Sequence, residues 1–111
     1  MNENEIINAP ETDEERGVGE YEFVIPAKID GEEKKSIPYD FTALNGSNIR
    51  HARTELQKRG YTVAVKELDE VFHAAMFAEA AGLSYADVER FSHRDYTAVA
   101  DLAQVFLYGE E

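Results

Sequence analysis

The chain has 111 residues, a net charge of −12 at pH 7 and no cysteine. This length predicts one domain, and without cysteine neither a disulfide framework nor a thiolate metal site can form. The acidic excess argues against nucleic acid as a ligand, because phosphate contacts need clustered lysine and arginine. The sequence has neither a secretory signal nor an apolar stretch long enough to span a bilayer, so we expect a soluble protein that does not bind membranes.

Residues 1–20 are strongly acidic. Seven acidic residues against Arg16 alone give this segment a charge of −6, so it holds half of the total of −12. A segment so acidic and so poor in large apolar side chains cannot bury enough surface to offset the entropy of ordering it. We therefore expect residues 1–20 to be a disordered, solubilising tail and residues 21–111 to form a single domain.

Residues 21–41 alternate between apolar and polar side chains in the manner of a β-hairpin, with an Asp-Gly turn at 30–31. A two-residue loop at that turn would pair Val24 with Ile37 and place the apolar residues of the two strands on opposite faces. A three-residue loop that begins one residue earlier pairs Phe23 with Ile37 and brings the apolar residues together. We therefore predict the three-residue loop.

Helical patterns occupy most of the remaining chain. Asn45 marks the start of the first helix, and Gly60 marks its end. Gly82 and Leu83 similarly indicate the end of the second helix, whose apolar stripe we expect to comprise Leu68, Val71, Phe72, Ala75 and Met76. The predicted helices span about residues 47–59, 66–81, 84–90 and 93–108.

Two helix-start signatures follow Gly82 in close succession. Ser84 precedes Asp87, and Ser92 precedes Asp95, both at the spacing of an N-cap hydroxyl and a first-turn carboxylate. An isolated hairpin is marginal in water, so it must dock on these helices. We predict an α+β fold, mostly α-helical, in which the N-terminal hairpin packs on three main helices plus a short helical turn.

No pattern in the chain indicates catalysis or a cofactor. His51, His73 and His93 lie on three different segments, and no paired-ligand motif accompanies them, so we interpret them as exposed or capping residues. A metal-dependent enzyme that uses His73 and His93 is the alternative. Asp40 and Asp95 stand in helix-start regions, where a carboxylate is more often a cap than a general base. We expect no catalytic, cofactor-binding or metal-binding residue.

The last predicted helix carries an apolar stripe that ends in aromatic residues. Most residues of such a stripe belong to the core, but a chain this small need not cover all of it, and an uncovered patch marks a partner surface. A groove for a partner helix is a common use of such a surface. The predicted partner-binding residues are Tyr96, Val99, Phe106, Leu107 and Tyr108.

The order of apolar and turn positions along the chain also forms a recognisable pattern. It comprises residues 39–46 (YDFTALNG), Ile49, Ala52, Leu56, Gly60, the 68–83 helix, Asp95-Tyr96 and Phe106-Leu107. This pattern, with the preceding hairpin, resembles the tail assembly chaperones of long-tailed bacteriophages and related prophages. The resemblance covers residues 21–108 and excludes the acidic tail. Asn48 departs from it, because the family often has an acidic residue there.

The resemblance implies a non-enzymatic role in virion assembly in the cytoplasm of the host bacterium. Such chaperones bind and solubilise the tape measure protein, assist polymerisation of the tail tube protein around it, and are absent from the mature virion. Many are made in two lengths by ribosomal frameshifting, and this chain would correspond to the short form. The resemblance leaves self-association open. The alternative is an acidic nucleic-acid mimic that inhibits a DNA-binding protein, which predicts ordered rows of carboxylates on the folded body.

Overall fold

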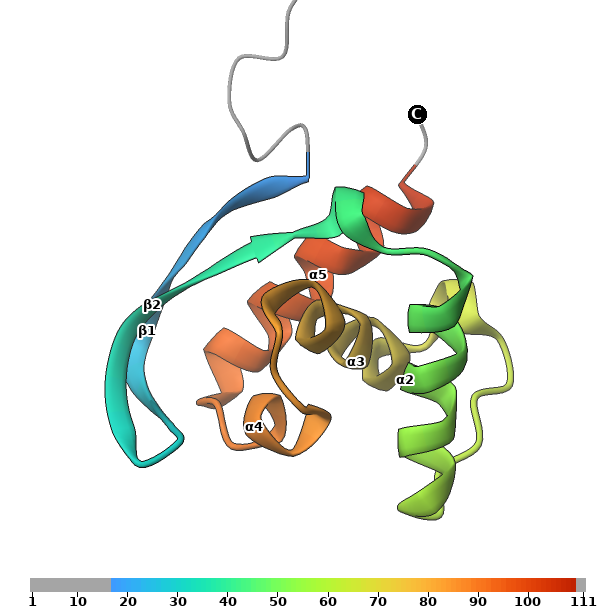
Figure 1. The fold of residues 1–111 in the computed structure, drawn as a ribbon, viewed down its shortest axis with the longest axis horizontal. Helices are drawn as coiled ribbons and strands as arrows, with labels where there is room; N and C mark the ends of the chain where they lie inside the picture. The colour runs from blue at the N-terminus through green and yellow to red at the C-terminus, as the bar shows by residue number, and fades with distance from the viewer. Residues whose placement is uncertain (1–16, 110–111) are drawn as a thin grey trace, which may run out of the picture.

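The computed structural model describes residues 17–109, in which an antiparallel hairpin is followed by helices (Figure 1). The predicted fold class, a mostly helical α+β fold, is confirmed. The elements are β1 (Val18–Ile29), β2 (Glu32–Asp40), η2 (Phe41–Ala43), α2 (Gly46–Lys58), η3 (Lys66–Leu68), α3 (Glu70–Ala81), α4 (Tyr85–Glu89) and α5 (His93–Tyr108). Residues 1–16 of the expected tail lie outside the described residues, while residues 18–20, which we assigned to the tail, belong to β1.

The turn of the hairpin differs from the prediction. Ile29 pairs with Glu32, so the loop consists of Asp30 and Gly31 alone, and the expected three-residue loop is wrong. Both loop residues have positive φ, 54° and 80°, as in a type I′ turn. The twist of that turn matches the twist of the strands, and aspartate and glycine adopt positive φ at low cost.

A bulge in β1 provides the odd offset that we had assigned to the turn. Four residues, Phe23 to Pro26, lie opposite Lys35 alone, after which pairing resumes. Because the offset is odd, the apolar residues of both strands still share one face. Tyr21 therefore lies opposite Ile37, whereas we expected Phe23 to do so.

Helix α3 is the centre of the molecule. It lies between α2 and α5 in Figure 1, and the hairpin curves around the α4 and α5 side. Every residue from Phe72 to Ala78 is buried, as is typical of a helix that is covered on all sides. The expected one-sided stripe is therefore too narrow. Leu68 was wrongly included in it, because this residue lies in the separate turn η3 and is 81% exposed.

The helix boundaries follow the predicted signals closely. Gly60 and Gly82 have φ of 82° and 73°, and the residue after each donates to a carbonyl five positions earlier, as in a Schellman motif. Ser84 and Ser92 accept hydrogen bonds from the N–H groups of residues 87 and 95. The exception is the 66–81 helix, which the structure divides at Asp69, the N-cap of α3. Among the described helices, none combines the length and the apolar character that crossing a membrane requires.

Candidate partner-binding groove

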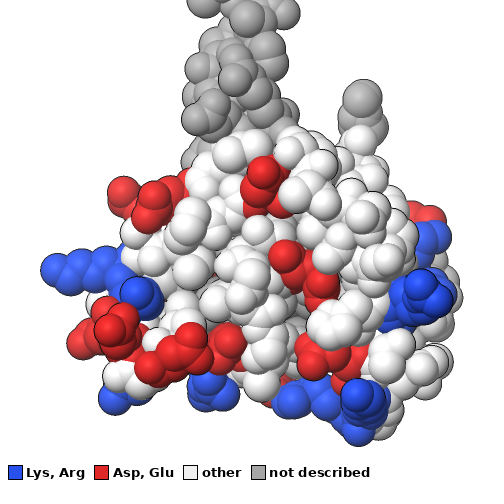
Figure 2. Space-filling model, in the orientation of Figure 1, with Lys and Arg blue, Asp and Glu red and all other residues white. Residues whose placement is uncertain are grey.

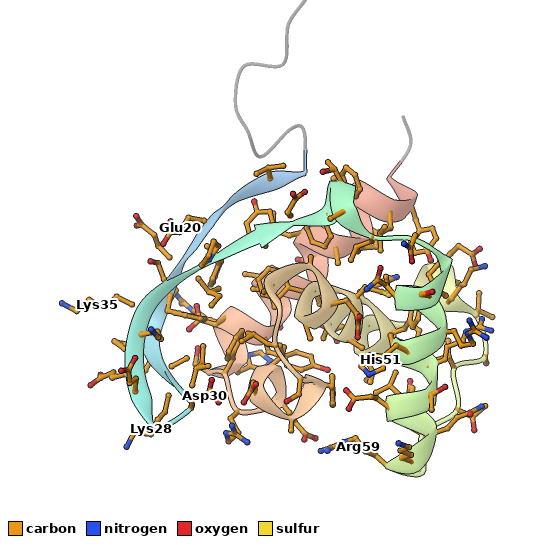
Figure 3. The ribbon with its side chains drawn as sticks, in the orientation of Figure 1. Glu20, Lys28, Asp30, Lys35, His51 and Arg59 are labelled. Atoms are coloured by element: carbon orange, nitrogen blue, oxygen red, sulfur yellow. The ribbon has the colours of Figure 1, made fainter. Side chains whose placement is uncertain are left out.

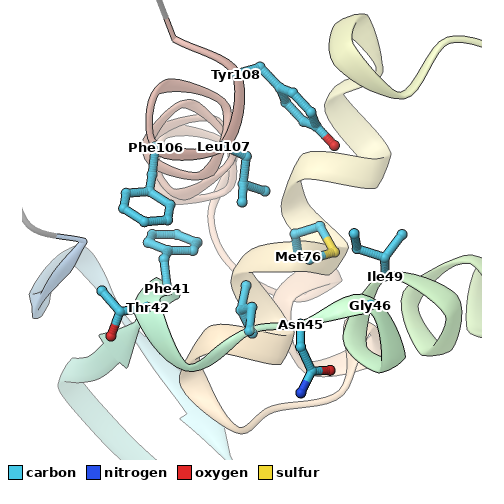
Figure 4. Close-up of a pocket in the computed structure, with 10 residues that line it drawn as sticks. Phe41, Thr42, Asn45, Gly46, Ile49, Met76, Phe106, Leu107 and Tyr108 are labelled. Carbon is cyan, nitrogen blue, oxygen red and sulfur yellow. The ribbon is translucent and has the colours of Figure 1, made fainter. Parts of the chain in front are cut away.

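An apolar groove of about 390 Å³ lies where the ends of several elements meet (Figure 4). Met76 of α3, which is 1% exposed, lies in the buried part of the groove. The C-terminal turn of α5 forms one side of the groove. The lining residues are Phe41, Thr42, Leu44, Asn45, Gly46, Ile49, Met76, Phe106, Leu107 and Tyr108. The volume falls within the range of ordinary ligand pockets, so the groove is large enough to receive bulky side chains.

One rim of the groove is an aromatic stack. The rings of Phe41 and Phe106 are nearly parallel, 18° apart, with centroids 5.3 Å apart. Phe41 is buried, whereas Phe106 remains 39% exposed. Gly17 holds this arrangement at its base, because its carbonyl accepts the N–H of Phe41 at 2.7 Å and its missing side chain leaves room for the Phe106 ring. The stack therefore presents one covered ring and one available ring.

Two polar side chains along the groove, those of Asn45 and Thr42, are engaged within the fold. Asn45 accepts the N–H of Ser47 as the N-cap of α2, and the Thr42 hydroxyl donates to Asp40 at 2.5 Å. The Tyr108 hydroxyl is protonated at neutral pH with its ordinary pKa of about 10, and burial raises that pKa further. The lining thus supplies apolar contact area rather than a proton donor or acceptor that titrates near pH 7.

The structure brings together three of the five predicted partner-binding residues. Phe106, Leu107 and Tyr108 all line the groove. Val99 does not, because it is 0% exposed in the core, so its prediction as a contact residue is wrong for this conformation. Tyr96 lies three turns earlier on α5, where its hydroxyl is 2.8 Å from that of Tyr85, and so it does not belong to the groove.

The lining residues on the other side of the groove were not predicted from the sequence. Phe41, Leu44, Ile49 and Met76 each fit a local pattern of strand end, turn or helix stripe. Nothing in those patterns shows that the end of the hairpin, the start of α2 and the end of α5 converge. The nearest signal was the resemblance, whose pattern contains residues 41, 44 and 49 as well as 106 and 107.

The opposite end of α5 is anchored by a buried carboxylate. Asp95 is 0% exposed and accepts hydrogen bonds from the Tyr21 hydroxyl at 2.6 Å and the Ser92 hydroxyl at 2.6 Å. It also accepts the N–H groups of Val24 and Ile25, at 2.8 and 3.1 Å, which the bulge has freed from the ladder. We predicted a helix-start role for Asp95, and its further role as the anchor of the bulge was missed.

Hydrogen bonding determines the charge state of this anchor. Burial alone would raise the pKa of Asp95, but the bonds from Ser92, Tyr21 and two backbone N–H groups outweigh burial and hold the pKa below its ordinary value. Asp95 is therefore an ionised, fully hydrogen-bonded acceptor at neutral pH. Burial and, after it, the hydrogen bond to Asp95 raise the pKa of the Tyr21 hydroxyl, which remains a donor.

The histidines are held in separate environments. We expected exposed or capping histidines; His73 is buried instead, and its Nε2 lies 2.9 Å from the carbonyl oxygen of Lys66. His51 pairs with Glu79, and this hydrogen bond is the main cause of its raised pKa. His93 is exposed at the start of α5. Within residues 17–109, no group of three potential ligands is arranged to hold a metal ion.

Comparison of the chain with known proteins gives no match from which a role for this groove could be inferred. No family model matches the chain, and neither a curated protein nor a solved structure matches it.

Proposed function

We propose that this protein is a phage tail assembly chaperone that binds and solubilises the tape measure protein and assists tail tube assembly without catalysis. The observation that carries the proposal is the open apolar groove at the end of α5, where Phe106 is 39% exposed above a buried floor. A long helical client presents apolar side chains at intervals of three to four residues, and such side chains fit a groove of this kind. The resemblance of the sequence to this family supports the same reading.

The charges of the molecule suit a protein that keeps an apolar client in solution. A net charge of −12 favours colloidal solubility of a complex whose apolar surfaces are covered. Holding the client by mass action requires no nucleotide and no reacting group. In the infected cell we place this activity in the bacterial cytoplasm, before the virion is complete.

The distribution of charge speaks against the alternative of a nucleic-acid mimic. Figure 2 shows basic side chains beside acidic ones along the margin of one face, while further acidic side chains lie toward the middle of that face. Ion pairs such as Arg59 with Glu89 and Arg90 with Asp87 interrupt the negative surface further. Figure 3 shows Lys35 and Glu20 pointing outward from the hairpin, and Lys28 pointing outward near its tip, close to Asp30.

Co-expression with the tape measure protein encoded nearby tests the proposal. Phe106→Asp and Leu107→Asp place a carboxylate on the groove, so we expect the client to lose solubility at least severalfold while the chaperone stays folded. Val105→Asp is the matched control, because Val105 precedes them on α5, is 64% exposed and does not line the groove.

The readout is the soluble fraction of the client, with circular dichroism to establish that each variant is folded. The control should leave client solubility unchanged. If the two groove variants also leave it unchanged while folded, the groove does not bind the tape measure protein. If a wild-type chaperone fails to solubilise the client at all, the proposed function itself is wrong.

A further inference from the structure

The chain enters the described fold at the rim of the groove. Residues 1–16 connect directly to Gly17, whose carbonyl accepts the N–H of Phe41 and whose Cα lies against the ring of Phe106. Both phenylalanines line the groove. Any apolar group in residues 1–16 is therefore tethered next to an apolar site in the same molecule, which gives it a high effective concentration there.

The segment contains one pair of large aliphatic residues, Ile6 and Ile7. Ile7 precedes Gly17 by ten positions, and an extended chain of that length spans up to about 33 Å. The tether is thus long enough for Ile6 and Ile7 to reach any part of a groove that begins beside Gly17. Burial of an isoleucine side chain stabilises such a contact by about 1.5 to 3 kcal/mol.

The charges beside the groove complement those beside the isoleucine pair. Arg50 and Arg53 are exposed on α2, next to and one turn beyond Ile49, and neither forms an ion pair within residues 17–109. Burial raises the pKa of Tyr108, the charge of Lys66 opposes that rise, the charge of Glu67 adds to it and the charge of Arg53 opposes it, so both cations and this carboxylate lie near the Tyr108 end. Lys66 is paired with Glu67, which leaves Arg53 as the cation there without an ion pair among the described residues. On the segment, Glu3 and Glu5 precede Ile6 and Ile7, and Glu11 follows them.

We propose that residues 5–11 of this chain occupy the groove of the same molecule, with Ile6 and Ile7 against the apolar lining and the flanking glutamates toward Arg50 and Arg53. The segment then acts as an intramolecular competitor that a client must displace. Contact between the segment and the groove does not depend on the proposed function, whereas competition with the tape measure protein rests on it.

Paramagnetic labelling of the full chain tests the contact. Because the chain has no cysteine, Ser47→Cys creates a single attachment site for a nitroxide on an exposed residue next to Gly46 of the groove. Glu33→Cys places the same label at the tip of the hairpin as a matched control. We expect the methyl signals of Ile6 and Ile7 to lose at least half of their intensity with the label at 47 and to be unaffected by the label at 33.

Dilution then identifies which molecule supplies the segment. Loss of intensity that is independent of protein concentration supports the intramolecular contact. Loss that disappears on dilution, or equal intensities with the two labels, overturns it, the former in favour of a second copy's segment. Arg50→Glu with Arg53→Glu should restore part of the intensity, because it reverses the charge that attracts the glutamates.

Client affinity tests the competition separately. Ile6→Ser with Ile7→Ser removes the apolar contact, so the full chain should bind a tape measure fragment about threefold to tenfold more tightly, as expected when a closed state is removed. Asn2→Ser with Asn4→Ser, outside the proposed segment of residues 5–11, is the matched control and should leave the affinity unchanged. Unchanged affinity of the isoleucine variant, with wild-type binding intact, overturns the competition. No binding by any variant contradicts the proposed function and leaves the labelling result as the test of the contact.

Discussion

The two ends of helix α5 differ in how the rest of the molecule covers them. At its start, the hairpin covers the helix, and Asp95 collects four hydrogen bonds from other groups in a fully buried position. At its end, Phe106, Leu107 and Tyr108 face a groove that no described residue fills. The covered end is fixed by directional polar contacts, and the open end offers only apolar area.

This contrast separates stability from recognition along one helix. A buried carboxylate with four donors tolerates little change, because removal leaves several buried groups without a partner. An apolar surface tolerates exchange of one covering group for another, since burial of apolar area is not directional. Variants at the first end should therefore affect folding, and variants at the second should affect binding.

Removal of the anchor should produce the largest effect. Asp95→Ala leaves the Tyr21 hydroxyl and the N–H groups of Val24 and Ile25 without their acceptor. We expect the free energy of unfolding, measured in urea, to fall by about 3 kcal/mol. Asp101→Ala, at an exposed position of the same helix, should change it by less than about 0.5 kcal/mol. Similar losses in the two variants would show that the anchor is not what secures the hairpin.

A methyl group at Gly17 should have a smaller effect, at the open end. Its Cβ would lie 2.5 Å from Cε1 of Phe106, so the ring must leave its stack with Phe41. Gly31→Ala is the matched control, because φ is 80° there against 86° at Gly17 and no atom lies within 4 Å of the added Cβ. We expect Gly17→Ala to cost about 1 kcal/mol more than Gly31→Ala in urea unfolding.

The ring signals of Phe106 provide a second readout for this pair of variants. They should shift in Gly17→Ala, because stacking on Phe41 changes the magnetic environment of the ring, and stay in place in Gly31→Ala. Equal stability losses with an unmoved Phe106 would mean that the rim of the groove does not depend on Gly17.

What the sequence predicted correctly was determined by local interactions. The caps of α2, α4 and α5 and the ends of α2 and α3 depend on residues within about six positions of each other, as at Gly82 and Leu83. The fold class followed from these segments and from the need of the hairpin for support.

What the sequence did not predict depends on contacts between distant positions. The strands required an odd offset, and the alternation alone does not tell whether the turn or a bulge supplies it. The bulge is possible because Asp95, 71 positions from Val24, accepts the hydrogen bonds that the ladder loses. In the same way, helical spacing placed Val99 and Phe106 on one stripe but did not show that only the end of that stripe stays uncovered.

Acid should weaken the covered end selectively, by no more than the lowered pKa of one carboxylate allows. Because the pKa of Asp95 is lower in the folded protein than in the unfolded chain, its contribution is complete above the unfolded value of about 4 and is lost as the pH falls through the folded value. One such group contributes at most about 1.4 kcal/mol per pH unit. Asp95→Asn cannot titrate, so its unfolding free energy should fall less steeply than that of the wild type in this pH window, as urea titrations at a series of pH values would measure.

His51 acts in the opposite direction. Its pKa is raised in the folded protein, so its contribution to stability is present at low pH and is lost as the pH rises through the folded value. Parallel curves for the wild type and Asp95→Asn below pH 4 would place the acid sensitivity in other carboxylates and remove the physical distinction between the two ends of α5.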